Sequence, residues 1–276
     1  MSRPDAKLVP VDFGDSWERQ LILSSIPLKC LTPEKEIRGY ASGCLIDYLG
    51  HRLVLSVSHA TLKSGLWAIE LGCWSGDRGM KLLPLPAMNF LGRISTDNLL
   101  KAFKEGKLDD LSKNIVDFSY GIIPKETESL HEQFSDNGQL QWKATRTVFK
   151  TTLTEKPETG VKYGFSGHTQ LEQLPHPTNS QLSVLCATQT ICGDLAYLKT
   201  EDDVHYFKLP GKHPGHIHFE GCSGAPIIDE QGRVVALVQG GNLDEDTVYG
   251  VSLSKYKMAV DIEAGNIPGL PKKAVS

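Results

Sequence analysis

Short apolar runs broken by Gly, Pro and Asn recur from Leu21 onward, and this punctuation constrains the fold more than any other feature. The pattern is typical of an antiparallel all-β protein, because each run is long enough for one strand and each break suits a turn. Residues 43–48 and 52–57 predict a hairpin around Gly50. Residues 66–71 and a run through Asp117 predict further strands.

The second half of the chain continues the same pattern. Residues 161–167, 183–188, 233–238 and 248–253 are predicted strands.

Two segments of the chain depart from the strand pattern. Residues 95–106 begin with polar capping residues, continue with helix formers and end at glycine, which predicts a short helix. Residues 125–140 are polar without a clear period and are interpreted as a linker between the two halves.

Composition excludes several classes of protein. With 40% hydrophobic and 22% charged residues, the 276-residue chain has the make-up of a globular protein. A net charge of −4 argues against nucleic acid as a partner. Residues 1–7 lack the apolar core of a secretory signal, and no stretch is long enough to cross a bilayer. Six cysteines in a chain of this length are no disulfide scaffold, so we expect a cytoplasmic protein without a membrane partner.

Ser223 stands between two glycines in the segment Gly-Cys-Ser-Gly-Ala-Pro, residues 221–226. Glycine accepts backbone angles that other residues resist, so such a serine can sit at the tip of a tight turn with its hydroxyl exposed. His59 follows an apolar strand and is a candidate base for that hydroxyl. Asp117 is the candidate acid to orient the histidine, with Asp109 and Asp110 as alternatives.

The chain order His, Asp, Ser, with the serine in a G-x-S-G-x-P frame, resembles the chymotrypsin/trypsin-like serine peptidases. The resemblance covers about residues 21–260. It implies an all-β fold of two six-stranded antiparallel barrels with the active site in the cleft between them. The implied organisation is an N-terminal arm (1–20), a first barrel (21–128), a second barrel (129–262) and a C-terminal tail (263–276).

The resemblance also implies the role of each site residue. Ser223 would attack the scissile carbonyl, His59 would take and return the proton, and Asp117 would hold the imidazole in the right tautomer. The N–H groups of Gly221 and Ser223 would form the oxyanion hole, and a side chain at Gly221 would obstruct substrate. The expected function is therefore that of a serine endopeptidase with a narrow protein target or controlled activity.

Two positions depart from the secreted members of that family. Cys222 stands where they carry the aspartate that pairs with a newly cleaved N-terminus, so activation by that route is not expected. Cys222 lies one position before the place of a nucleophile and is interpreted as a buried structural thiol. Ala60 replaces the cysteine that usually follows the catalytic histidine, which fits a reducing compartment.

The resemblance places the S1 pocket, which holds the residue on the acyl side of the scissile bond (P1), around Ile217. Ile217 would form the base in place of the acid that selects Lys or Arg, so an apolar or polar P1 residue is expected. The acidic residues 244–246 are the alternative source of charge for this pocket. The predicted pocket residues are Ile217, His218, Gln239, Gly241 and Gly250.

Residues 212–218 hold three histidines, and with Cys186 and Cys192 they raise the alternative of a zinc-dependent binding protein. Because this segment falls in the S1 loop, we expect no metal and no cofactor. The other alternative is a catalytically silent trypsin-like fold that binds peptides. The expected partner is a protein or peptide substrate, and an activating partner protein that orders the loop 211–220 is a further hypothesis.

Overall fold

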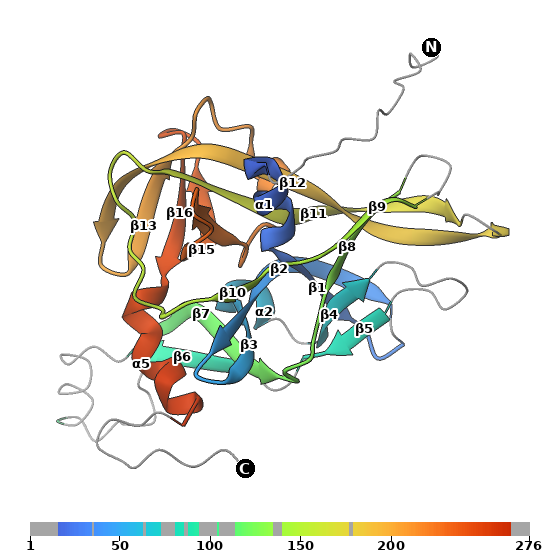
Figure 1. Cartoon of the computed structure of the whole chain (residues 1–276), viewed down its shortest axis with the longest axis horizontal. Helices are drawn as coiled ribbons and strands as arrows, with labels where there is room; N and C mark the ends of the chain where they lie inside the picture. Colours follow the sequence, from blue (N-terminus) through green and yellow to red (C-terminus); the bar gives the residue numbers. More distant parts are fainter. Residues whose placement is uncertain are drawn as a thin grey trace.

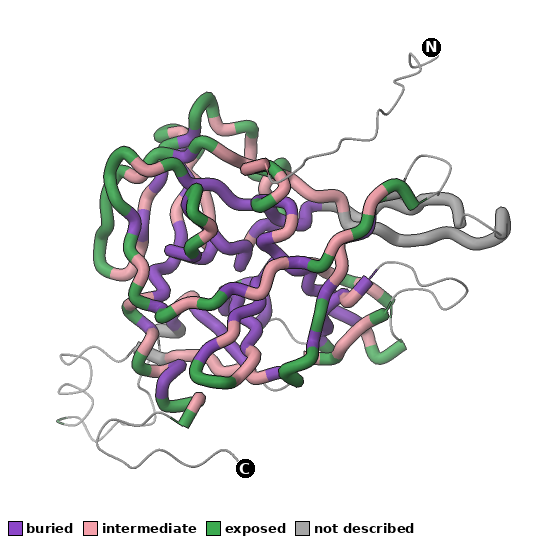
Figure 2. The backbone as a smooth tube through the Cα atoms, viewed as in Figure 1, coloured by how far each residue is buried: buried purple, intermediate pink, exposed green. Residues whose placement is uncertain are grey.

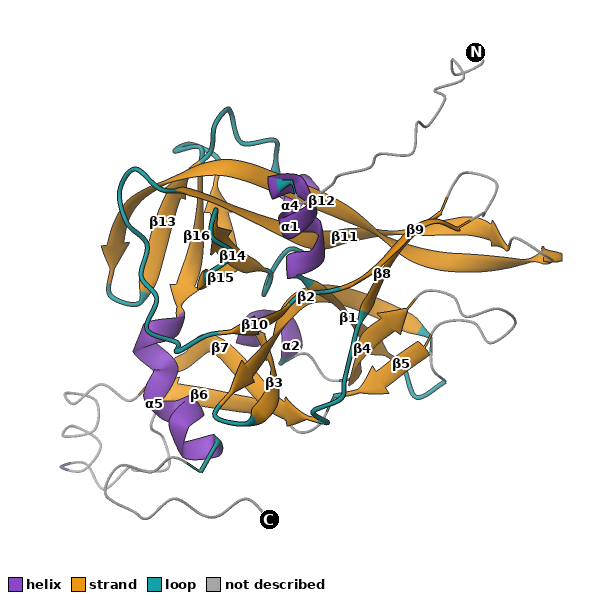
Figure 3. Cartoon of the chain, in the orientation of Figure 1, coloured by secondary structure: helices purple, strands orange, loops and turns teal. Residues whose placement is uncertain are grey.

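The computed structural model describes residues 16–34, 36–62, 65–72, 81–85, 88–93, 104, 114–134, 140–176 and 179–265. Strands dominate these residues, and the helices between them are short (Figure 1, Figure 3). The predicted all-β class is thus confirmed. None of the described helices is long and apolar enough to cross a membrane. The predicted helix at 95–106 and the candidate acids Asp109 and Asp110 lie outside the described residues, apart from Lys104.

The first half forms an eight-stranded sheet in the order β5-β4-β1-β2-β3-β7-β6, with β10 beside β2. All pairs are antiparallel except β10 with β2. The predicted hairpin is β2 and β3, whose two turn residues Leu49 and Gly50 both have positive φ, as tight hairpin turns require. The strands of the eight-stranded sheet are β1 (Ile26–Leu31), β2 (Ile37–Tyr48), β3 (His51–Ser56), β4 (Leu66–Gly72), β5 (Lys81–Pro84), β6 (Asn89–Arg93), β7 (Asn114–Ile123) and β10 (Val148–Lys150).

The second half closes into a six-stranded barrel in the order β11-β12-β13-β16-β15-β14. Figure 1 shows that β11 and β12 form a long hairpin. All strand pairs of the barrel are antiparallel, as predicted. The strands are β11 (Lys162–His176), β12 (Asn179–Glu201), β13 (Val204–Lys208), β14 (Pro226–Asp229), β15 (Val234–Asn242) and β16 (Thr247–Ser252).

Each half has a core of buried apolar residues, and buried residues are drawn in purple in Figure 2. Phe165 and Phe207 lie fully buried in the closed barrel. The other core fills the first half and extends to Ile228 and Leu237 on β14 and β15. The two halves therefore share apolar contacts, which fixes the strands that carry the site residues relative to one another.

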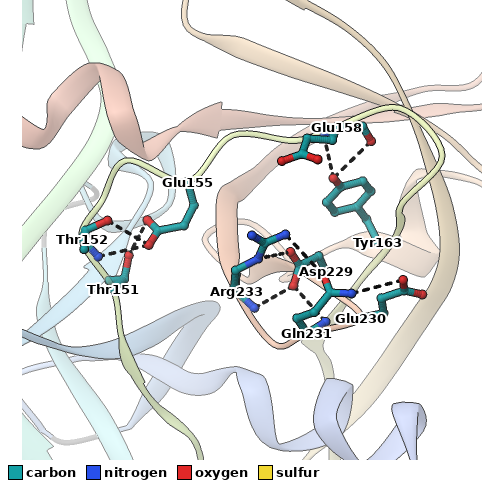
Figure 4. A network of polar contacts seen from close by, with 9 residues as sticks. All are labelled: Thr151, Thr152, Glu155, Glu158, Tyr163, Asp229, Glu230, Gln231 and Arg233. Atoms are coloured by element: carbon teal, nitrogen blue, oxygen red, sulfur yellow. Dashed lines mark hydrogen bonds and ion pairs between the residues drawn. The ribbon is translucent and has the colours of Figure 1, made fainter.

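The segment that links β10 to β11 is held by local polar contacts (Figure 4). The Glu155 carboxylate accepts hydrogen bonds from Thr151 Oγ1 at 2.7 Å and from the Thr152 backbone at 3.1 Å. On the neighbouring turn, the buried Asp229 accepts from Arg233 Nε at 2.6 Å. That turn joins β14 to β15, the two strands that follow the Ser223 turn.

Several elements were not predicted from the sequence. The helix α1 spans Trp17–Ser24, and its Leu21 packs so closely that a Cβ on Gly164 would lie 2.9 Å from Leu21 Cδ2. Within the predicted linker lies β8 (Leu130–Phe134), which pairs with β9 (Leu140–Thr145) just after it. The helix α5 (Leu253–Glu263) is the last described element, and it contacts the first half through Asp261, which accepts a hydrogen bond from Tyr48.

Candidate active site

His59 lies on the short helix α2 (Ser58–Thr61), directly after β3 and Val57. The Thr61 hydroxyl donates to the Val57 carbonyl at 3.0 Å, which fixes the start of this turn. The His59 side chain is 48% exposed, so the imidazole is about half open to solvent although the backbone of its turn is held in place. The apolar strand β3 and one helical turn after it therefore position His59.

Asp117 lies on β7, which pairs with β3 in register Ser56↔Ser119. Its Oδ2 is 2.7 Å from His59 Nδ1, and its Oδ1 accepts from the His59 backbone N–H at 2.8 Å. The Ser58 hydroxyl donates to the same Oδ1 at 3.1 Å. Burial by itself raises the pKa of Asp117, but the hydrogen bonds and charge of His59, with the bond from Ser58, outweigh it and lower the pKa below its usual value. Asp117 is therefore an ionised acceptor at neutral pH.

Ser223 sits in the turn before β14, and its Oγ is 2.9 Å from His59 Nε2. Gly221 and Gly224 on either side have φ of 92° and 88°, the left-handed region that favours glycine. The Gly224 N–H donates to the Val238 carbonyl at 2.8 Å, which ties the turn to β15. The structure thus brings Ser223, His59 and Asp117 into one hydrogen-bonded chain.

The backbone of the same turn is arranged around Gly221 and Ser223. The Cys222 N–H donates to Phe219 O at 3.0 Å, and the Ala225 N–H donates to Cys222 O at 2.9 Å. Among the described residues, no acceptor pairs with the N–H groups of Gly221 and Ser223. These two groups are therefore free to bind a developing oxyanion.

Gly221 is required for a reason that differs from the sequence interpretation. A Cβ at this position would lie 2.3 Å from the His168 carbonyl oxygen and 2.5 Å from Tyr40 Cδ2. The steric conflict is therefore with the protein itself, before any substrate is considered. Both the close packing and the positive φ demand glycine at this place.

Cys222 is completely buried, with its Sγ against Gly167, where a Cβ would come within 2.5 Å of it. Burial, with a smaller contribution from Cys192, raises the pKa of Cys222 to about 12. A thiol in this state is a poor nucleophile at neutral pH, so its position agrees with a structural role. Cys30, Cys44, Cys192 and Cys222 are free thiols among the described residues.

A cavity of about 300 Å³ opens beside Ser223. Of the residues predicted for the S1 pocket, Ile217 and Gly241 line this cavity, whereas His218, Gln239 and Gly250 do not. Ile217 is 74% exposed, so it lies at the rim and forms no base. The lining residues are Phe165, His213, His216, Ile217, Phe219, Glu220, Ser223, Val238, Gly240, Gly241 and Val248.

The loop before Ser223 is held by backbone hydrogen bonds and by a contact with Asp246. Asp246 Oδ1 accepts from the His213 N–H at 2.8 Å, and its Oδ2 is 3.7 Å from Lys208 Nζ. The carboxylate of Asp246 therefore binds the loop backbone and Lys208, and Asp246 is not among the residues that line the cavity. Within the described part of the chain, no three His, Cys, Asp or Glu side chains are grouped to hold a metal ion.

Sequence reasoning missed Ser42, which joins the two halves at the site. Its Oγ donates to the Gly221 carbonyl at 2.8 Å and accepts from the His168 N–H at 2.9 Å. Its backbone N–H donates to the Ser223 carbonyl at 3.0 Å. A serine in the middle of a strand carries no local signal for such a role, because its partners are far away in the sequence.

The strand topology and the arrangement of Ser223, His59 and Asp117 are those of a chymotrypsin/trypsin-like fold. No protein-family model and no curated protein matches the sequence. Among solved structures, HL collagenase is 15% identical with a TM-score of 0.51, covering 89% of this chain and 95% of that one. A structure of HBP is 12% identical with a TM-score of 0.52, covering 92% and 96%. Human heparin binding protein is 11% identical with a TM-score of 0.50, covering 92% and 96%.

These similar structures establish the fold and leave the activity open. One carries the name of an enzyme and another the name of a binding protein. The same fold therefore serves proteins named for different tasks, and the function of this chain has to be argued from its own site.

Proposed function

We propose that this protein is a serine endopeptidase in which Ser223 is the nucleophile, His59 the general base and Asp117 the orienting acid. The hydrogen-bonded chain from Ser223 Oγ through the imidazole to the Asp117 carboxylate carries the proposal, with distances of 2.9 and 2.7 Å. A serine hydroxyl is a weak nucleophile unless a base accepts its proton, and His59 Nε2 is at the distance that this transfer needs.

The ionised Asp117 accepts from His59 Nδ1, which leaves Nε2 unprotonated and able to take the proton of Ser223. As Oγ attacks the peptide carbonyl, negative charge develops on its oxygen, and the N–H groups of Gly221 and Ser223 would stabilise that charge. His59 then gives the proton to the leaving amine, which completes acylation. Water repeats the same steps to release the acyl group from Ser223.

The activity is expected to be confined to a narrow protein target or to a controlled state. A cytoplasmic location is part of the proposal, supported by Ala60 in place of the usual disulfide cysteine and by the free thiols. Cys222 offers no carboxylate to pair with a new N-terminus, which argues against activation by cleavage. An activating partner that orders residues 211–220 remains a proposal.

Hydrolysis of a peptide library, read by mass spectrometry, tests the proposed function. Wild-type protein should generate new peptide termini, and Ser223→Ala should generate none above background. Ser254→Ala, a half-buried serine on α5, is the matched control and should retain hydrolysis. A wild-type protein that folds but cleaves nothing would support the peptide-binding alternative.

A further inference from the structure

The hydroxyl of Ser58, the first residue of α2, faces two acceptors on β7. Its Oγ is 2.9 Å from the Val116 carbonyl oxygen and 3.1 Å from Asp117 Oδ1. A serine hydroxyl carries one proton, so it can donate at full strength to only one of these two oxygens. Ser58 is buried, so bulk water competes little for that proton. The acceptor that it takes is therefore the one with the greater negative charge.

The carboxylate of Asp117 carries that greater charge at neutral pH. Burial raises the pKa of Asp117, but the hydrogen bonds and charge of His59, with the bond from Ser58, outweigh it and lower the pKa. A hydrogen bond to an ionised acceptor is roughly twice as strong as a bond between neutral groups. The Ser58 proton is therefore directed to Asp117 Oδ1, although the Val116 carbonyl oxygen is slightly closer.

The two oxygens of Asp117 have different partners on α2. Oδ1 accepts from the His59 backbone N–H at 2.8 Å and from Ser58, whereas Oδ2 is 2.7 Å from His59 Nδ1. The terminal torsion of an aspartate side chain has broad energy wells, so one donor leaves the carboxylate plane free to turn. Two donors that converge on Oδ1 restrict this rotation and keep Oδ2 directed at the imidazole.

The donor is itself held in place by the turn that carries His59. The Leu62 N–H donates to the Ser58 carbonyl at 2.7 Å, and the Thr61 N–H donates to the Val57 carbonyl at 3.3 Å. The hydroxyl of Ser58 thus belongs to α2 and its acceptor belongs to β7. The bond joins the two elements that carry the proposed base and the proposed acid.

We propose that Ser58 is a positioning residue, whose hydroxyl holds Asp117 Oδ1 so that Oδ2 meets His59 Nδ1. The inference rests on the proposed endopeptidase function and adds a residue to its site. Among the described residues, His59 is the titratable group that acts on Asp117, and Ser58 is the other side chain that donates to it. When Asp117 is protonated, the Val116 carbonyl becomes the acceptor for Ser58.

The first test measures how fast a fluorophosphonate labels Ser223. Ser58→Ala should be labelled roughly threefold to tenfold more slowly than wild type, the effect of losing one net hydrogen bond. Ser58→Cys keeps a weak donor of similar size and should recover part of the rate. The Cys variant also covers the case in which Ser58→Ala folds poorly.

Ser119→Ala is the matched control for these variants. Ser119 is a buried residue of β7, and its hydroxyl is 3.0 Å from the Thr61 hydroxyl on α2. The control therefore removes a buried bond between the same two elements without removing a donor to Asp117. It should lose stability and keep the wild-type labelling rate.

The second test follows the protonation of Asp117 by carbon-13 NMR of the carboxyl groups. Its signal is the one that Asp117→Asn lacks. In Ser58→Ala this signal should titrate at a higher pH than in wild type, because the ionised carboxylate has lost a donor. Ser119→Ala should titrate as wild type does. A role of Ser58 in stability alone, through Val116, would not move this titration.

Two outcomes would overturn the inference. An unchanged titration of Asp117 in Ser58→Ala would assign the hydroxyl to the Val116 carbonyl. Equal labelling rates in Ser58→Ala and Ser119→Ala would show that the contact does not position the acid. The proposed function fails separately, if folded wild-type protein is not labelled at Ser223. In that case an unchanged Asp117 titration still overturns the contact, and a raised one still supports it.

Discussion

Ser42 donates a hydrogen bond from its Oγ to the carbonyl oxygen of Gly221 at 2.8 Å. This contact connects β2 of the first half to the turn that carries the proposed nucleophile. The Ser42 backbone N–H also donates to the Ser223 carbonyl at 3.0 Å. One serine thus fixes the position of the nucleophile turn relative to the half that carries His59 and Asp117.

Ser42→Ala should lower both stability and reactivity. The change leaves the Gly221 carbonyl and the His168 N–H without this partner, at a cost of about 1–3 kcal/mol in the free energy of unfolding. Chemical denaturation and the rate of fluorophosphonate labelling measure the two effects. Ser129→Ala is the matched control, because Ser129 Oγ makes a buried bond of 2.8 Å to the Glu70 carbonyl away from the site. The control should lose stability without losing the labelling rate, and equal rate losses would contradict a positioning role for Ser42.

Asp117→Asn should reduce kcat by roughly ten-thousandfold, as the loss of the orienting acid does in a Ser-His-Asp triad. The amide NH₂ of asparagine would face His59 Nδ1 and favour the tautomer with its proton on Nε2, which cannot accept the proton of Ser223. Steady-state hydrolysis of a peptide that the wild-type protein cleaves measures the effect. A harmless substitution would move the acid to Asp109 or Asp110.

The lowered pKa of Asp117 predicts a pH-dependent contribution to stability. A folded-state pKa below the unfolded value means that the ionised carboxylate stabilises the fold above the usual carboxyl pKa of 3.8. This contribution is lost as the pH falls through the folded-state value. The difference in unfolding free energy between wild type and Asp117→Asn should therefore shrink as the pH falls from about 5 to below 3. A difference that stays constant over this interval would contradict the lowered pKa.

Thiol chemistry should leave the activity intact. Because burial raises the pKa of Cys222 to about 12, almost none of this thiol is ionised at pH 8. Hydrolysis should therefore survive treatment with iodoacetamide and with dithiothreitol. Rapid loss of activity with iodoacetamide, accompanied by a modified Cys222, would contradict the buried structural role.

The sequence was sufficient for the parts of the fold and site that depend on local patterns. The strands around Gly50 follow from the short apolar runs on either side of it, and the Ser223 turn follows from its flanking glycines. The role of Ser42 could not be predicted, because its bonds to Gly221 and His168 span long stretches of chain.

The pocket was predicted less well than the nucleophile turn for a similar reason. The position of Ile217 before the serine indicated a pocket residue, but its exposure depends on how residues 211–220 fold back. The helix α5 was missed because its apolar contacts are made with the distant first half.

The mass of the intact protein after reaction with a fluorophosphonate tests the central claim most directly. The account predicts one adduct per chain at pH 8, located on Ser223 by peptide mapping, and no adduct in Ser223→Ala or in wild type unfolded beforehand. A folded wild-type protein that gains no adduct, or that gains it on a residue other than Ser223, would contradict the assignment of Ser223 as the nucleophile.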